Sequence, residues 1–310
     1  MALLLSDVAV NTQDHLYGFL IDEFRKSSFL LDNLPFDDAV SPVGGGATMT
    51  YSYNRVITQA TAATRAINSE YDTQEAKKKR YSVDLKIFGG AFEIDRVLAN
   101  MGGITDEVQF QMQQKIKATQ ALFSDMVING DTENDANGFD GLSKALEDTD
   151  NALTTTVDVS NAANVASNYM ALLEEIDALV GSLDGTPSAL LMNAKTKAKF
   201  MSVARRASMY QETRNTLGQK IDSYGGTPII DLGAKSGTND PIVANGEIYA
   251  VRFGLDGFHA VSASGQNPIK YWLPDFNTAG AVKKGEVEML AAVALKATKA
   301  AAKLTGIVVA

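Results

Sequence analysis

The residue types that most often do chemistry in enzymes are scarce in this chain. Cysteine is absent from its 310 residues, which excludes disulfides, thiolate metal ligands and cysteine nucleophiles. The two histidines, His15 and His259, lie in unrelated contexts, and neither belongs to a paired-histidine metal motif. Glycine-rich nucleotide-binding motifs and the nucleophile elbow of serine hydrolases are also missing from the sequence. We therefore expect no catalytic residues, no cofactor and no metal, and we interpret both histidines as structural.

A carboxylate-rich segment that begins at Asp131 superficially resembles a calcium-binding loop. Counted from Asp131, the loop has Ala136 where glycine is needed and Leu142 where the bidentate glutamate should stand. Counted from Glu133, the glycine falls correctly, but Lys144 occupies the twelfth position. The motif fails in both registers, so a weak cation site among these carboxylates remains only a minor alternative.

One basic cluster, Lys77-Lys78-Lys79-Arg80, lies in the first third of the chain, and three interpretations of it are open. It could be a solvated stretch near a hairpin tip, or it could meet the acidic segment from Asp131 to Asp150 on a neighbouring subunit. Nucleic-acid binding ranks third, because a net charge of −9 opposes broad neutralisation of phosphates. The candidates for contact between subunits are Arg65, Glu70, Lys77, Lys78, Lys79 and Arg80.

The N-terminal part predicts an arm followed by a projecting hairpin. In residues 1–46, prolines and a triple glycine break regular structure, so we expect an arm with one short helix around residues 15–29. β-forming residues recur in residues 47–58 and 81–88, with about twenty polar residues between them. Two such strands bury little apolar surface alone, so the hairpin must be covered by something else.

The remainder predicts an α+β body. Apolar residues at helical spacing in residues 104–128 predict a long helix, with Thr105 as the candidate N-cap. A second apolar stripe predicts a helix over residues 162–183, followed by a short buried strand and a helix capped by Asn193. Further strands are expected at residues 227–232, 242–253, 257–261, 269–273, 286–296 and 304–309.

The order of these features resembles the major capsid proteins of tailed bacteriophages with the Hong Kong 97-like fold, over essentially the whole chain. The most specific piece is the long helix that runs into Asn129-Gly130-Asp131 and then Gly138-Phe139-Asp140-Gly141-Leu142, which is similar to the family's spine helix and its following turn. The resemblance implies an N-terminal arm (1–46), an extended loop (47–90), a peripheral domain (91–155) with spine helix 104–128, an axial domain (156–283) and strands returning to the peripheral domain (284–310).

The same resemblance implies a structural protein and not an enzyme. It would be a head subunit that self-assembles as hexamers and pentamers into an icosahedral virion shell, formed in the host cytoplasm. The shell would enclose DNA without sequence-specific binding, a role that an acidic surface suits because it does not hold packed DNA. Scaffolding, portal and decoration proteins are candidate partners, and no membrane is involved.

The sequence leaves two alternatives to a phage capsid protein, an encapsulin and a hydrolase. An encapsulin shell has the same fold, but the long hairpin favours the phage protein. A hydrolase with an Asp/Glu pair would be expected to lack a projecting polar hairpin. Some family members cross-link a lysine to an asparagine. Lys77 to Lys79 lie in roughly the corresponding loop, but no asparagine or glutamate partner can be identified, so a cross-link is not predicted.

Overall fold

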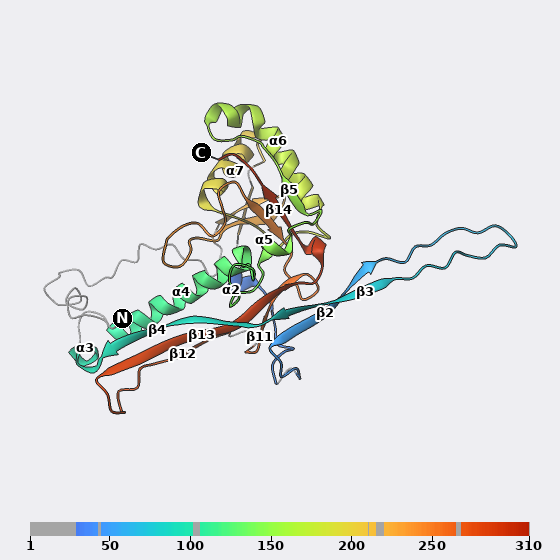
Figure 1. The fold of residues 1–310 in the computed structure, drawn as a ribbon. Coiled ribbons are helices and arrows are strands. Elements are labelled where there is room, and N and C mark those ends of the chain that lie inside the picture. Colours follow the sequence, from blue (N-terminus) through green and yellow to red (C-terminus); the bar gives the residue numbers. More distant parts are fainter. Residues whose placement is uncertain are drawn as a thin grey trace.

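The computed structural model describes residues 29–42, 45–101, 106–209, 211–214, 220–264 and 268–309. The predicted arm helix near His15 and most of the arm lie outside these ranges. The described part opens with α2 (Phe29–Asn33) and β1 (Phe36–Asp37). Figure 1 shows a body that contains two β-sheets and a narrow two-stranded ribbon that projects from it.

The first sheet, here called the long sheet, is organised around one C-terminal strand. β13 (Val282–Leu295) pairs antiparallel with β4 (Lys86–Asp95) along one edge. Along its other edge it pairs with β12 (Ile269–Trp272) and then with β11 (Phe258–Ser262), and β1 adds to β11 in parallel. The helix α4 (Glu107–Asn129) packs on one face of this sheet, and the short helix α3 (Arg96–Met101) follows β4 (Figure 1).

The start of α4 corrects the predicted cap. Asp106 is the N-cap, and its Oδ1 accepts hydrogen bonds from the amides of Val108 (2.9 Å) and Gln109 (3.3 Å). The prediction of Thr105, which lies outside the described residues, was therefore wrong. A carboxylate satisfies two of the free amides at a helix start and also interacts favourably with the helix dipole.

The end of α4 explains the most specific sequence motif. The helix stops at Asn129, as predicted, and the Gly130 amide donates to the Met126 carbonyl (2.9 Å). A Cβ atom on Gly130 would lie 2.2 Å from the Phe139 carbonyl oxygen, so only glycine fits there. The Gly141 amide donates to the Gly130 carbonyl at 2.8 Å. The two glycines thus close the acidic loop back onto the helix end, where the single-turn helix α5 (Leu142–Ala145) follows.

The core between α4 and the long sheet is aromatic. Phe123 of α4 is fully buried, and its ring lies 6.1 Å from those of Phe36 and Phe88 and 6.4 Å from that of Phe139. These rings come from the helix, from two strands of the sheet and from the acidic loop. One aromatic cluster therefore fixes the loop, the arm strand β1 and the sheet relative to the helix.

The second sheet has seven strands and carries two helices, α6 (Ala162–Gly181) and α7 (Ala194–Arg206). The predicted Asn193 cap is confirmed, because its Oδ1 accepts from the Thr196 amide at 2.8 Å. In spatial order the strands are β5 (Ala152–Thr154), β14 (Ala301–Thr305), β10 (Ile248–Val251), β6 (Ala189–Met192), β9 (Thr227–Asp231), β8 (Lys220–Tyr224) and β7 (Gln211–Arg214). No helix in the described ranges is long and apolar enough to span a bilayer.

The C-terminal strands do not all return to the same place. β13 lies beside α4 in the long sheet, but β14, predicted as a strand at residues 304–309, lies between β5 and β10 in the second sheet. Conversely, β11 and β12 fall within residues 156–283 yet belong to the long sheet. All five residues of β11 are buried, because β11 lies between β13 and β1 in the sheet. The position of β11 in the sequence does not reveal these neighbours.

Candidate assembly surfaces

The projecting ribbon is the predicted hairpin, with one correction. β2 (Thr50–Thr58) and β3 (Lys77–Asp84) pair antiparallel, and residues 59–76 join them (Figure 1). The predicted second strand, 81–88, is in fact the end of β3 and the start of β4. Between them Leu85 is buried, and its amide donates to the Met49 carbonyl at 2.7 Å. Ile87, two residues beyond Leu85, is 59% exposed on the long sheet.

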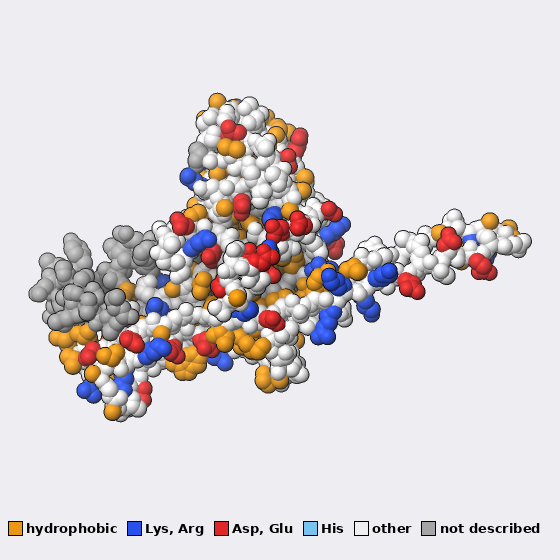
Figure 2. Space-filling view, viewed as in Figure 1, with side chains coloured by type: hydrophobic (Ala, Val, Ile, Leu, Met, Phe, Trp, Pro, Cys, Tyr) orange, Lys and Arg blue, Asp and Glu red, His pale blue; other side chains and the backbone are white. Residues whose placement is uncertain are grey.

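The four consecutive cations of β3, Lys77 to Arg80, do not form one patch, because alternate residues of a strand point to opposite faces. In the register of the ribbon Lys79 lies opposite Arg55, next to the Tyr53–Tyr81 pair. Lys78 and Arg80 therefore lie on the other face of the ribbon, opposite Val56 and Asn54. All four cations are exposed, and Figure 2 shows basic side chains gathered where the ribbon leaves the body.

Lys79 has a structural role on the tyrosine face. Its Nζ lies 5.3 Å from the centre of the Tyr81 ring, and the Arg55 guanidinium lies 4.5 Å from the same ring. The Tyr53 and Tyr81 rings stack at 5.9 Å. Cations held over aromatic faces stabilise the ribbon locally. Lys78 and Arg80 make no such contact in the described residues, which leaves them available to a partner.

The root of the ribbon is fastened to the end of β13. The Tyr53 hydroxyl donates to the Leu295 carbonyl (3.0 Å), and Arg55 Nε donates to the Lys296 carbonyl (2.9 Å). The Tyr51 hydroxyl donates to Asp37 Oδ2 at 2.7 Å, which also ties the ribbon to β1. Three segments that are far apart in the sequence therefore meet at this root.

His259 lies within the same junction and is fully buried. Its ring meets the Tyr51 ring edge-on at 5.6 Å, and neither ring nitrogen has a hydrogen-bond partner in the described part of the chain. Burial, together with the charge of Lys296, lowers the pKa of His259 to about 4. Asp37, whose Oδ2 lies 3.9 Å from His259 Nε2, opposes this shift but does not outweigh it. The histidine is therefore neutral at pH 7.

The apex of the ribbon is an ordered turn. The Ser69 amide donates to the Ala66 carbonyl (3.2 Å), and an Arg65 guanidinium nitrogen donates to the Ser69 carbonyl (3.2 Å). Between them Ile67 is 92% exposed. Glu70 follows the turn and is exposed. The structure thus places Arg65 and Glu70 in the apex segment and the four cations of β3 near the root, so the six candidate residues form no single site.

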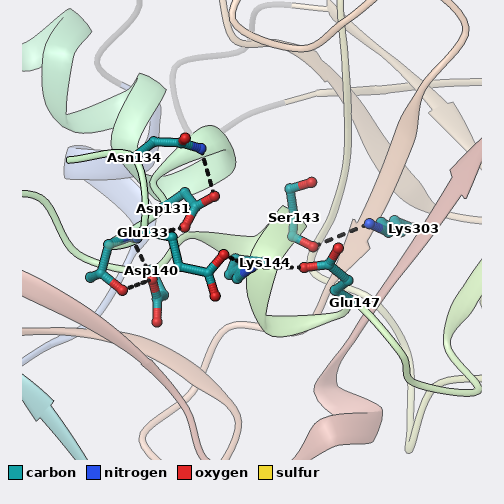
Figure 3. A network of polar contacts seen from close by, with 9 residues as sticks. Asp131, Glu133, Asn134, Asp140, Ser143, Lys144, Glu147 and Lys303 are labelled. Atoms are coloured by element: carbon teal, nitrogen blue, oxygen red, sulfur yellow. Dashed lines mark hydrogen bonds and ion pairs between the residues drawn. The ribbon is translucent and has the colours of Figure 1, made fainter. Parts of the chain in front are cut away.

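The acidic loop, residues 131–150, contains seven carboxylates and one lysine, and much of this charge is used within the loop (Figure 3). Asp131 accepts from the Glu133 amide (2.9 Å) and from the Asn134 side chain (2.8 Å). Lys144 Nζ pairs with Glu133 (3.2 Å) and Glu147 (3.1 Å). Among the described residues no group of His, Cys, Asp or Glu side chains is arranged to hold a metal ion.

Two functional candidates escaped the sequence analysis. Arg55 anchors the ribbon root, but an isolated arginine inside a β-forming run gives no signal of that contact. Trp272 on the edge strand β12 is 49% exposed, and its neighbours Tyr271 and Leu273 are 59% and 57% exposed. The available signal was that Trp272 is the only tryptophan in the chain, because exposed tryptophans are enriched at protein interfaces.

Comparison with known proteins shows similarity in structure alone. Neither a family model nor a curated protein sequence matches the chain. The holo-SrpI encapsulin complex from Synechococcus elongatus PCC 7942 contains a chain 13% identical, with a TM-score of 0.62 over 99% of this chain and 96% of its own. A chain of Mycobacterium phage Bobi is 13% identical, with a TM-score of 0.62 over 97% of each chain. A chain from the capsid of Myoviridae phage XM1 is 11% identical, with a TM-score of 0.60 over 99% of each. The chain therefore has the fold of these chains, the Hong Kong 97-like fold that its sequence resembles.

Proposed function

We propose that this chain is the major capsid protein of a tailed phage, a structural subunit that assembles as hexamers and pentamers into an icosahedral shell around DNA. The observation that carries the proposal is the ribbon of β2 and β3, which projects from the body and buries little of its own surface. The likeness of the whole chain's fold to chains of a phage capsid and of an encapsulin complex also supports the proposal.

The ribbon lacks apolar cover from the rest of its own chain over much of its length. A two-stranded hairpin is marginally stable in water, and here Val56 and Ile57 are 61% and 54% exposed. Both strands also have a free edge in the described part of the chain, a surface that readily pairs with another chain. Neighbouring subunits would cover these surfaces, and the contacts would include Arg65, Glu70, Lys77, Lys78, Lys79 and Arg80.

The remaining parts of the proposal follow from the same assignment. The subunit would enclose DNA without reading its sequence, because a net charge of −9 opposes broad neutralisation of phosphates. It would act without catalysis, as a virion component assembled in the host cytoplasm. Scaffolding, portal and decoration proteins would be its partners.

Electron microscopy and analytical ultracentrifugation of the purified full chain test the proposal. We expect closed shells or ring-shaped capsomers whose abundance rises with protein concentration. In a trimmed variant, Asn-Gly replaces residues 59–76 and joins Thr58 to Lys77, which face each other in the ribbon. This variant should retain the circular dichroism spectrum and the unfolding midpoint of the body but form no shells.

Three outcomes would contradict the proposal. Monodisperse monomers of the unaltered chain at every concentration would exclude a shell-forming role. Shells of normal shape from the trimmed variant would show that residues 59–76, the distal part of the ribbon, are not an assembly element. Shells that contain a foreign enzyme and no DNA after isolation from the native source would assign the chain to an encapsulin instead.

A further inference from the structure

The outer side of β12 is a free strand edge of the long sheet. β12 pairs with β13 through one side, and no strand of the described ranges pairs with its other side (Figure 1). A free edge presents unpaired backbone N–H and C=O groups, which readily pair with another chain. We call residues 269–273 along this side the β12 edge.

The β12 edge is apolar and exposed at the same time. Tyr271, Trp272 and Leu273 are each about half-exposed, and Lys270 is the one charged residue among the five. Edge strands that stay unpaired usually carry charges that oppose pairing. Exposed aromatic residues beside unpaired backbone groups are instead typical of a surface that becomes buried on association.

A proline bounds the β12 edge at each end. Pro268 precedes Ile269, and Pro274 follows Leu273. Because proline has no N–H group to donate, strand pairing stops where it stands. The edge is therefore a segment of five residues with the same kind of boundary on both sides.

We propose that the β12 edge pairs antiparallel with the β12 edge of a second copy of this chain, about a two-fold axis at Tyr271. The two long sheets would then form one continuous sheet. A two-fold contact uses the same patch on both copies, so each side-chain pair occurs twice. The inference rests on the proposed shell-forming function and adds one contact between subunits to it.

The side chains of the edge complement themselves in this register. Tyr271 lies opposite Tyr271 of the second copy, and the two rings can pack together. Lys270 lies opposite Trp272, the aromatic ring most favourable to a cation. Ile269 lies opposite Leu273, so apolar residues meet apolar residues. Opposite residues share one face of the sheet, with their Cβ atoms about 4.5–5.5 Å apart, close enough for all of these contacts.

The two neighbouring registers are worse. A shift by two residues in one direction places Lys270 opposite Lys270 of the second copy, and like charges directly opposite each other are destabilising. A shift in the other direction places Lys270 opposite Pro274, which cannot donate a hydrogen bond. The sequence of the edge therefore favours the register centred on Tyr271.

The charges beside the edge do not oppose the pairing. Within its own sheet Lys270 lies opposite Glu288, and Glu286, which lies opposite Trp272, is paired with Lys284. Lys270 would lie between Glu288 of its own chain and Trp272 of the second copy. No two like charges are brought opposite each other, and the contact depends on backbone bonds and aromatic packing.

The small size of the contact sets its expected strength. Five residues from each copy bury far less than the roughly 1,600 Å² of a typical stable complex. We therefore expect weak, reversible association of free subunits. In a shell, the other contacts of each subunit would hold the edges together and make the same pairing persistent.

The absence of cysteine makes a precise test possible. Tyr271→Cys gives each chain one thiol opposite its counterpart, within the about 4.4–6.8 Å between Cα atoms that a disulfide spans. Mild oxidation should then produce disulfide-linked dimers rapidly. Lys270→Cys chains alone and Trp272→Cys chains alone should stay largely unlinked. An equal mixture of the two should cross-link, because residues 270 and 272 face each other.

A matched control is Leu255→Cys, at a position 52% exposed and away from the edge, which should stay largely unlinked. The reversible association is measured by sedimentation below the concentration at which shells form. Tyr271→Lys places like charges on the two-fold axis and should weaken it by about tenfold or more, whereas Tyr271→Phe should change it by less than about twofold. Quenching of the sole tryptophan, Trp272, by acrylamide should fall as the unaltered subunits associate.

Several results would overturn the pairing. Tyr271→Cys may link no faster than Leu255→Cys, or Lys270→Cys chains may link with themselves, which would assign another register. If the thiol of Tyr271→Cys neither links nor reacts with a thiol reagent, another segment of the chain covers the edge. Shells from the unaltered chain without linking of Tyr271→Cys would reject the pairing and leave the shell-forming function intact. Linked dimers of a chain that never forms shells would do the reverse.

Discussion

The second sheet and the ribbon are built from the same kind of strand pairing, yet they obtain their stability in different ways. All four residues of β6 and of β10 are buried, whereas the first four residues of β3 are all exposed. Backbone hydrogen bonds alone contribute little net stability, because water competes for the same groups. The body is therefore held by apolar burial within one chain, and the ribbon depends on its root contacts.

The largest expected effect comes from damage to the body. Phe123→Ala removes the ring that contacts Phe36, Phe88 and Phe139, and should lower the free energy of unfolding by about 3–5 kcal/mol. Val56→Ala on the ribbon should change the same quantity by less than about 0.5 kcal/mol, as exposed positions do. Urea unfolding of the unassembled subunit measures both. A large loss from Val56→Ala would remove the contrast between the two regions.

An intermediate effect is expected at the junction of body and ribbon. His259 has a pKa of about 4 in the folded chain, below its ordinary value of 6.5, because it is buried. Between these values the unfolded chain binds a proton that the folded chain does not, so stability falls as the pH is lowered from 6.5 to 4. The loss from this group should reach about 3 kcal/mol.

His259→Leu should remove that contribution. We expect urea unfolding to show a smaller loss between pH 6.5 and pH 4 in the variant than in the unaltered chain. Val203→Leu, a buried change in α7 away from the junction, serves as a control that should keep the original pH dependence. Equal pH dependence in all three proteins would show that His259 is protonated in the folded chain.

The smallest change in global stability is expected from the ribbon root. Arg55→Lys keeps the charge but loses the planar contact with Tyr81 and the paired bonds to Leu295 and Lys296. The free energy of unfolding should change by about 1 kcal/mol or less, because the body does not depend on this contact. Trypsin should nevertheless cut faster at Lys77 to Arg80. An unchanged cleavage rate would mean that Arg55 does not fasten the ribbon.

Local signals in the sequence predicted much of this structure. The Asn193 cap, the end of α4 at Asn129 and the hairpin were all predictable, because capping and β-alternation depend on neighbouring residues. The partners of β11 and β14 were not, because strand pairing is decided by residues far along the chain. The break at Leu85 was hidden because alternation continues through it, although the two strands join different sheets.

The residues proposed for contact between subunits were also predicted incompletely, because their placement depends on strand pairing. A run of four cations in the sequence looks like one patch, but the pairing register divides Lys77 to Arg80 between two faces. The exposed side of the long sheet, opposite α4, could not be recognised either. Its residues come from β4, β12 and β13, and no single segment contains enough of them to show a pattern.

The position of β13 and β14 has a consequence for synthesis on the ribosome. β13 is the strand to which β4, β11 and β12 all pair, and β14 separates β5 from β10 in the second sheet. Residues 282–305 emerge from the ribosome after every other strand, so neither sheet can close while they are still in the exit tunnel. Chains that are still being translated therefore lack a finished long sheet. Under the proposed shell-forming function, nascent subunits on the same messenger RNA would lack this surface before release, which would keep assembly from starting on polysomes.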